Sequence, residues 1–324
     1  MPTRLHRREF TRLAAGLAAL PLVARAQGGG AWPSRPVTVV VPFAPGGAGN
    51  GSVRIVGEAI APRLGQPLVV DNRPGGGGIT GTQMVCASQD DHLLLMGSTS
   101  MTILPALRKD LSYDVQRDLQ PVGMLSSQPQ AIVTAANGPL QSLDQLVHKA
   151  KAGEIAVGNS GVGTLSHLAT ALMNRKLGLK LLPVPYKGDS VLLPDVVAGT
   201  VPLGMVNLPV AMQLIRGGRL KALAITSAQP DAQLPDVPLL RSLGGDFVIT
   251  GWAALFAAHK VPAAGVERFS VQLREVLAEA SVRERFVGLG VEPWPSTAGE
   301  LREFMRKETQ RWGEVVRTSD IRLE

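Results

Sequence analysis

Residues 37–64 read VTVVVPFAPGGAGNGSVRIVGEAIAPRL, and this stretch contains the pattern that decides the fold. The β-branched run Val37–Val41 has the length of a strand, a loop rich in glycine and proline follows it, and residues 52–64 have the apolar spacing of a helix. The strand is apolar without alternation, which is typical of a parallel sheet that helices cover on both faces. The stretch therefore predicts an α/β fold.

The same order of strand, loop and helix recurs along the chain. In a first unit, strands are expected at residues 68–70 and 93–96, with a helix at about 80–88 between them. The pattern then restarts, with helices expected from Ser142, which opens a capping box, and at about 165–177. The strands expected in this second unit are residues 131–135, 155–157, 181–184, 203–206 and 222–226.

The last part of the chain predicts a strand near 252–256 and two helices, which are too few elements for a separate domain. We therefore expect it to pack back onto the first unit. The result is two lobes joined by two crossovers, each lobe a mainly parallel sheet flanked by helices. The first lobe is predicted to comprise residues 27–128 and 247–324, and the second lobe residues 129–246.

Much of the positive charge lies at the N-terminus. The 324 residues include 33 Lys and Arg against 26 Asp and Glu, but residues 1–26 alone hold five arginines and one acid. A basic head, an apolar middle and the small residues on either side of Arg25 are typical of a signal peptide, and Arg7-Arg8 resembles a twin-arginine signal. Without them 28 basic residues face 25 acidic ones, a net charge of +3 that does not favour binding to nucleic acid. We expect a periplasmic protein.

Motifs of enzymes and metal sites are missing from the sequence. The single cysteine, Cys86, excludes an internal disulfide and a multi-cysteine metal site, and it is interpreted as a small buried hydrophobe. Val162 stands where a nucleophile elbow starting at Gly158 needs glycine. The sequence contains neither a Walker A motif nor a dinucleotide-binding fingerprint, and its histidines lack ligand spacing. No cofactor, no metal ion and no catalytic residue is therefore predicted.

Four glycine-rich loops each lie between a strand and a helix, at residues 42–50, 72–81, 97–101 and 158–164. In a parallel sheet such loops meet at the carboxyl ends of the strands, where ligands bind. Glycine allows close approach to backbone N–H groups, and a helix start adds free donors with a partial positive charge. The expected ligand is a small anion.

Three side chains near these loops allow two interpretations each. Lys187 either adds charge to the cleft or is a solvated residue of a turn. Arg73 either clamps an anion or supports its own loop, and His167 either contacts ligand or serves as a cap or core residue.

Six segments together carry a resemblance to a known family. They are WPSRPVTVVVPFAPGG at 32–47, RLGQPLVVDNRPGGGGITG at 63–81, SGVGTLSHLA at 160–169, VPYKGDS at 184–190, RLKALAITS at 219–227 and WGEVV at 312–316. From about residue 32 to the end, the chain resembles the Bug or TctC family, the periplasmic receptors of tripartite tricarboxylate transporters.

The resemblance implies a two-lobed periplasmic binding protein of type II, the venus-flytrap fold. It implies a monomer that captures a small carboxylate, such as an organic acid or an acidic amino acid, for membrane subunits of the transporter. The ligand-binding residues expected are Phe43, Ala44, Gly46, Gly47, Asn50, Gly76, Gly77, Thr80, Ser98, Thr99, Ser160, Gly161, Gly163, His167, Lys187 and Asn207. The alternative is an exported enzyme or ligand sensor built on the same cleft, although neither Ser160 nor Lys187 has an evident base partner.

The chain departs from the usual family pattern at several positions. Asn50 stands where the family usually has Asp, Leu104 replaces the Asn of an Asn-Pro pair, and Pro202 occupies a usually acidic position. These changes concern the choice of ligand rather than the fold, because Asn50 and Leu104 are expected near the cleft.

The glycines are expected to hold the ligand carboxylate directly. Neither glycine run contains Lys or Arg, so the N–H groups of Gly46 and Gly47, and those of Gly76 and Gly77, are predicted to point at it. A β-carbon at Gly47 is expected to crowd the ligand or to forbid the required backbone angles.

The first testable prediction concerns processing. Because residues 1–26 have the three parts of a signal peptide, the mature chain is expected to begin at or near Gln27. N-terminal sequencing of exported protein measures this directly, and an intact Met1 in that material would contradict the prediction.

Overall fold

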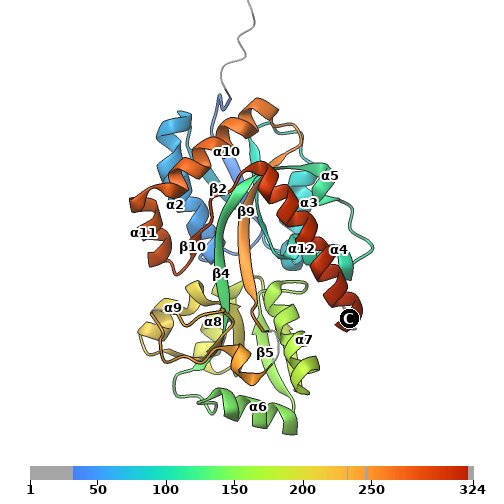
Figure 1. Cartoon of the computed structure of the whole chain (residues 1–324), viewed down its shortest axis with the longest axis vertical. Helices are drawn as coiled ribbons and strands as arrows, with labels where there is room; N and C mark the ends of the chain where they lie inside the picture. Colours follow the sequence, from blue (N-terminus) through green and yellow to red (C-terminus); the bar gives the residue numbers. More distant parts are fainter. Residues whose placement is uncertain (1–31, 232, 245–246, 320–324) are drawn as a thin grey trace, which may run out of the picture. The chain divides into compact units, whose positions relative to one another are not determined.

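The computed structural model describes residues 32–231, 233–244 and 247–319 (Figure 1). The predicted signal peptide, residues 1–26, lies outside the described residues. Among the helices that the structure describes, none is both long enough and apolar enough to cross a membrane.

The first group of strands is formed by β1 (Val37–Val41), β2 (Leu68–Asn72) and β3 (Leu93–Ser98). β1 lies between the other two and is parallel to both, as the uninterrupted apolar runs predict. Val39, Val40, Leu94 and Leu95 are fully buried. The helices that follow these strands are α2 (Ala48–Leu64), α3 (Ile79–Cys86) and α4 (Ser100–Leu107).

The second group of strands repeats this plan. β5 (Ile155–Asn159) lies between β6 (Leu181–Pro185) and β7 (Leu203–Asn207) and is parallel to both. The helices of this group are α6 (Leu143–Ala152), α7 (Leu165–Leu177), α8 (Asp189–Ala198) and α9 (Leu208–Arg216), and its remaining strand is β8 (Leu220–Ile225). One hydrophobic cluster contains residues of α6 and α7, and another contains residues of α8 and α9, so helices cover both faces of this group.

Two antiparallel strands join the groups. β4 (Leu119–Ala135) pairs with β9 (Thr250–Ala258) over residues 119–129 and with β7 and β8 over residues 130–135. β9 in turn pairs antiparallel with β3, so the strand order is β2-β1-β3-β9-β4-β7-β5-β6. Figure 1 shows β4 and β9 side by side, with β4 running from one group into the other. The predicted strand 131–135 is thus the end of a longer one, because Gln and Pro residues at 128–130 hide the earlier part from an apolar pattern.

The C-terminal segment contains one helix more than predicted. Its helices are α10 (Ala263–Ala278), α11 (Ala280–Gly288) and α12 (Ala298–Ser319), and the short strand β10 (Glu292–Pro293) pairs with β4. α10 and α11 pack against α2, and α12 packs against α4 and β4 (Figure 1). Trp312 and Val316 of α12 also belong to the hydrophobic cluster that contains α6 and α7, so this segment packs against both groups. The short helix α5 (Val115–Asp118), together with α4, α8 and α9, was not predicted from the sequence.

Candidate functional site

A cavity of about 80 Å³ lies at the carboxyl ends of the strands. Residues of the first group line it from the loops after β1 and β3, and residues of the second group line it from the loops after β5, β6 and β7. The connecting strands contribute Gln128 and Gln130 from β4, and Gly251 and Trp252 from β9. Both groups of strands therefore contribute walls to the same cavity.

Five helices begin at this cavity. Its lining includes residues of the first turn, or the N-cap, of α2, α4, α7, α8 and α9. None of these five N-termini has a side-chain cap, whereas Asp114 caps α5, Ser142 caps α6, and Thr297 and Glu300 form a reciprocal capping box at α12. α3, α10 and α11 also lack such a cap, so the distinctive feature of the five is that they share one cavity.

The convergence of these helices makes the cavity suitable for an anion. The first N–H groups of an α-helix have no partner within the helix, and the helix dipole places partial positive charge beside them. Within the described residues, no Lys, Arg or His lines the cavity. Attraction for an anion must therefore come from backbone and neutral side-chain donors rather than from a cationic side chain.

A hydrogen-bonded network runs along the wall formed by the second group. The side-chain Nε2 of Gln130 donates to Asn207 Oδ1 (2.6 Å), and Asn207 donates to Asp189 Oδ2 through its Nδ2 (2.6 Å) and its backbone N–H (3.0 Å). The hydroxyl of Ser160 donates to Asp189 Oδ1. Ser166 in turn donates to the Ser160 hydroxyl at 3.2 Å. Every one of these residues lines the cavity.

Asp189 is the acidic residue at the centre of this network. Its side chain is buried, with 5% of the residue exposed. Burial raises the pKa of Asp189, whereas the hydrogen bonds from Ser160 and Asn207 lower it. The sequence analysis found no base partner for Ser160, but the fold supplies Asp189 as the acceptor of its hydrogen bond.

A second network orients the loop after β1. Asn50 is buried, donates to Asn72 Oδ1 at 3.1 Å and accepts a hydrogen bond from Arg54 Nε at 2.9 Å. Asn72 then donates to the backbone oxygen of Phe43 at 2.9 Å. Both polar atoms of Asn50 thus have partners in the protein, and its side chain holds the loop in place while lining the cavity.

A second cavity of about 150 Å³ lies next to the first. The glycine run Gly75–Gly78 lines it on one side, and residues 160–162 and 185–187 line it on the other. Phe43 and Ser160 line both cavities. The glycine run Gly75–Gly78 therefore lines only the second cavity, whereas the loop after β1 lines the first cavity through Gly47 and both cavities through Phe43.

The loops of the two groups touch around this second cavity. Ala44 N–H donates to the backbone oxygen of Lys187 at 3.2 Å, and the Ser190 hydroxyl donates to the backbone oxygen of Pro45 at 2.7 Å. Gly77 has φ +65°, and a β-carbon placed there would lie 1.9 Å from the backbone oxygen of Val162. Glycine at this position therefore permits the close approach of the two groups.

The sixteen residues expected to bind ligand fall into three sets. Those that line the first cavity are Phe43, Ala44, Gly47, Asn50, Ser98, Thr99, Ser160 and Asn207. Those that line only the second cavity are Gly76, Gly77, Gly161 and Lys187. Those that line neither cavity are Gly46, Thr80, Gly163 and His167.

The residues outside both cavities have structural surroundings instead. Gly46 is exposed with φ +89°, and Gly163 packs so closely on Leu104 that a β-carbon would lie 2.4 Å from a Leu104 methyl carbon. His167 Nδ1 accepts a hydrogen bond from Gly163 N–H at 3.3 Å, and burial lowers the pKa of His167. Thr80 is exposed. Leu104 is buried away from the cavity lining, contrary to its expected place near the cleft.

One argument about Gly47 was wrong. Its φ is −74°, which any residue can adopt, and a β-carbon there would meet no atom closer than Ala44 O at 4.0 Å. The backbone does not require glycine at this N-cap position, so only crowding of the cavity remains as a reason for it. Arg73 forms an ion pair with Asp71 at 2.9 Å, in agreement with its interpretation as a support for its own loop.

Several lining residues were missed by the sequence analysis: Gln128, Gln130, Thr164, Ser166, Asp189 and Trp252. Asp189 could have been found, because it directly follows Gly188 at the end of a predicted strand and loop. The glutamines could not, because they lie on a strand that the apolar pattern does not reveal.

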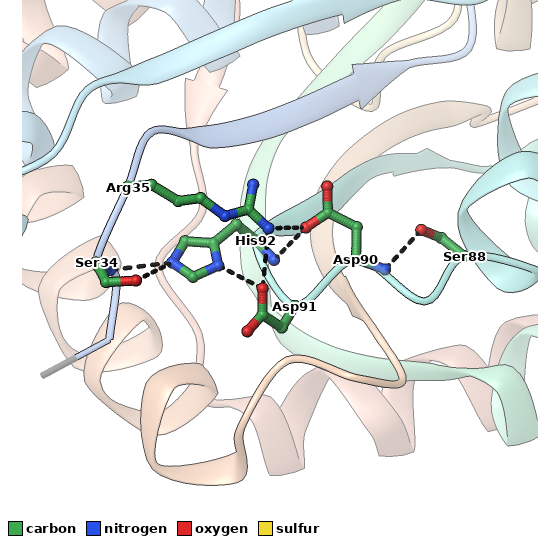
Figure 2. A network of polar contacts seen from close by, with 6 residues as sticks. All are labelled: Ser34, Arg35, Ser88, Asp90, Asp91 and His92. Atoms are coloured by element: carbon green, nitrogen blue, oxygen red, sulfur yellow. Dashed lines mark hydrogen bonds and ion pairs between the residues drawn. The ribbon is translucent and has the colours of Figure 1, made fainter. Parts of the chain in front are cut away.

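The free cysteine and a cluster of Asp and His residues are the other groups that could suggest a reactive thiol or a metal site. Burial raises the pKa of the Cys86 thiol to about 12, so it is a poor nucleophile. Asp90, Asp91 and His92 lie together, but Arg35 bridges the two carboxylates and His92 accepts a hydrogen bond from the N–H of Ser34 (Figure 2). This network ties the chain before β1 to the loop before β3, and nothing in it points to a metal ion.

A substitution at Gly77 tests the contact between the two groups. Gly77 and Gly178 have the same φ of +65°, but a β-carbon at Gly178 would have no atom within 4 Å. Gly178→Ala is expected to cost about 1–2 kcal/mol of unfolding free energy through the left-handed backbone alone. Gly77→Ala is expected to cost about 1–3 kcal/mol more, because its methyl group displaces Val162. Urea unfolding measures both, and equal losses would show that the contact does not constrain the loop.

The family model TctC, described as the tripartite tricarboxylate transporter family receptor, matches residues 52–321. The chain is 34% identical to protein BugT of Bordetella pertussis over 299 residues, which cover 90% of this chain and 92% of BugT.

Three solved structures are similar in fold along most of the chain. The periplasmic binding protein BugD has a TM-score of 0.85 at 29% identity, covering 90% of this chain and all of BugD. Rpa4515 of R. palustris with adipate has a TM-score of 0.85 at 27% identity, and the match covers 90% of this chain and 99% of Rpa4515. MatC of Rhodopseudomonas palustris with bound malate has a TM-score of 0.82 at 30% identity, and the match covers 88% of this chain and 100% of MatC. The protein belongs to the TctC family of tripartite tricarboxylate transporter receptors and has their two-lobed α/β fold.

Proposed function

We propose that this protein is a periplasmic solute-binding protein that captures a small carboxylate for a tripartite tricarboxylate-type transporter. The observation that carries the proposal is the set of five helix N-termini around one cavity that no cationic side chain lines among the described residues. A carboxylate supplies acceptors for their free N–H groups, and each favourable helix terminus contributes about 0.3–1 kcal/mol, or up to about 2 kcal/mol where it is partly buried.

The similar structures support this class of ligand. Two of them contain adipate and malate, both of which are small dicarboxylates. The cavity of this protein is also small and has polar groups from every wall, as a site for a short organic acid needs. The membrane subunits of the transporter are proposed as the partners that receive the ligand from a monomeric receptor, and the family description supports them.

Periplasmic location is proposed on two grounds. BugD, with a similar structure, is a periplasmic binding protein. The first 26 residues of this chain have the pattern of an export signal, and the N-terminal sequencing described above tests the location.

An enzymatic role is the alternative. Ser160 donates to Asp189, and a serine paired with a carboxylate could in principle act as a nucleophile. The relatives named above are binding proteins, and neither a histidine nor a lysine lines the cavity within the described residues to relay a proton. Chemical conversion of a bound acid at catalytic protein concentration would overturn the binding role.

The lobes are proposed to close around the ligand. Residues 27–128 with 247–324 form one lobe in this proposal, and residues 129–246 form the other. Support comes from β4, which changes pairing partners after Pro129, and from β9, which begins at Thr250. These are the segments in which the chain passes between the two groups of strands, so a hinge at this level would move both walls of the cavity.

Ligand binding is predicted to stabilise the protein and to depend on Gly47. A ligand that binds only the folded state, present at about 100 times its Kd, adds about 2.7 kcal/mol of unfolding free energy, which thermal shifts against a panel of carboxylates detect. Gly47→Val is expected to weaken binding at least about tenfold, because its side chain occupies space at the cavity wall. Calorimetry measures this loss.

Two controls accompany that experiment. Gly153→Val adds the same side chain at a C-cap with φ −152° and no atom within 4 Å, so binding should be unchanged. Arg73→Ala should also leave binding nearly unchanged, because Arg73 pairs with Asp71 and lines neither cavity. Loss of binding in Arg73→Ala together with normal binding in Gly47→Val would replace the backbone mechanism by a side-chain clamp.

Closure is predicted to reduce the radius of gyration. Small-angle scattering with saturating ligand should give a smaller value than scattering from the free protein, because the loops that meet around Gly77 and Lys187 are then held together. An unchanged radius in a sample that calorimetry shows to be loaded would indicate a rigid cleft instead.

A further inference from the structure

Asp189 places a carboxylate inside a cavity whose helix termini attract anions. It is the one acidic residue among the described residues that line this cavity, and it occupies the first position of α8. A carboxylate offers about four acceptor positions. Asp189 accepts one hydrogen bond on Oδ1, from Ser160, and two on Oδ2, from Asn207. One acceptor position on Oδ1 therefore remains open.

Other groups on the same wall are acceptors as well. Gln130 lines the cavity, and its Oε1 is buried with no hydrogen-bond partner. One hydrogen of its Nε2 is donated to Asn207, whose own side-chain nitrogen donates to Asp189. The wall formed by β4, β7 and α8 thus has open acceptor positions at Gln130 Oε1 and Asp189 Oδ1, which a ligand that brings donors can fill.

The opposite wall has the reverse character. α2 and α4 begin there with uncapped first turns, and Gly47, Ala48, Gly49, Thr99 and Ser100 line the cavity. No described acidic residue lies on this wall. The cavity is therefore polarised, with free donors on the side of the first group and a carboxylate on the side of the second.

Asp189 also restricts which charged group of a ligand can lie at its end of the cavity. The backbone N–H of Asn207, the N-cap of α9, already donates to this carboxylate, and the effect of a helix dipole is confined to its first turn. A ligand with carboxylates at both ends would place one of them beside Asp189 without a cationic side chain to separate the two. An ammonium group at that end would instead form a charge-assisted hydrogen bond.

We propose that Asp189 is a specificity-determining residue, and that the preferred ligand carries one carboxylate towards α2 and α4 and a primary ammonium group towards Asp189. This inference rests on the proposed function, since it assumes that the cavity binds a carboxylate. It separates this receptor from Rpa4515 and MatC, whose structures hold the dicarboxylates adipate and malate. Burial raises the pKa of Asp189, and an ammonium group bound beside it would lower that pKa again.

Matched ligands test the inference on the unmodified protein. Adipate is compared with the amino acid in which an ammonium group replaces one of its carboxylates, and succinate is compared with β-alanine in the same way. Calorimetry should show at least about tenfold tighter binding of the amino acid in at least one pair. Tighter binding of the dicarboxylates would overturn the inference while leaving the proposed function intact. Binding of neither class would overturn both.

A pair of variants assigns the preference to one residue. Asp189→Asn keeps the size of the side chain and an acceptor for Asn207, and it should reduce the preference for the amino acid at least about tenfold. Asp195→Asn is the matched control on the same helix, and it should keep the preference: Asp195 lines neither cavity and accepts a hydrogen bond from Tyr186, which lines only the second cavity. An unchanged preference in folded Asp189→Asn protein would overturn the role of Asp189. If that variant does not fold, the ligand comparison on the unmodified protein still decides the inference.

Discussion

The free N–H groups of helix first turns are the constraint on which the rest of this structure depends. Five helices start at one cavity without side-chain caps, and their donors need acceptors because buried backbone groups are costly to leave unpaired. Parallel strands bring all of these helix starts to the same edge of each group. The glycine-rich loops then keep side chains from filling the space between them.

The strands that connect the two groups also form part of the cavity wall. Gln128 and Gln130 lie on β4, and Gly251 and Trp252 lie on β9. A change in the relative position of the two groups would therefore change the cavity as well, which couples capture of a ligand to closure. The network from Gln130 through Asn207 to Asp189 continues this wall into the second group.

The glycine run Gly75–Gly78 illustrates how one sequence feature can serve a different purpose from the one that its composition indicates. All four residues have positive φ angles and lack side chains. Such a backbone is suited to binding an anion through its N–H groups, and equally to close packing against another segment. In the structure it lines the second cavity, and Gly77 packs on the backbone of Val162. Its main effect is to let the first group approach the second, whereas Gly47 and Gly49 line the cavity with the five helix starts.

Local patterns in the sequence predicted the α/β class, the strand–loop–helix order and the glycine-rich loops near the site. These follow from local patterns, because apolar runs and glycine positions act within a few residues of one another. Half of the sixteen residues on the expected list, from Phe43 to Asn207, line the first cavity, because strand ends are recognisable in the sequence.

The tertiary structure was needed to show that Gly47 and the run Gly75–Gly78 line separate cavities, that Gly47 has ordinary backbone angles, and that Asp189 lies among Ser160, Asn207 and the helix starts. The extent of β4 likewise depends on tertiary contacts, because Gln128 pairs with β9 and Gln130 pairs with β7. The physical reason is the same in each case. Burial, a close backbone contact or the partner of a carboxylate depends on groups far apart in the chain, and local propensity carries no information about them.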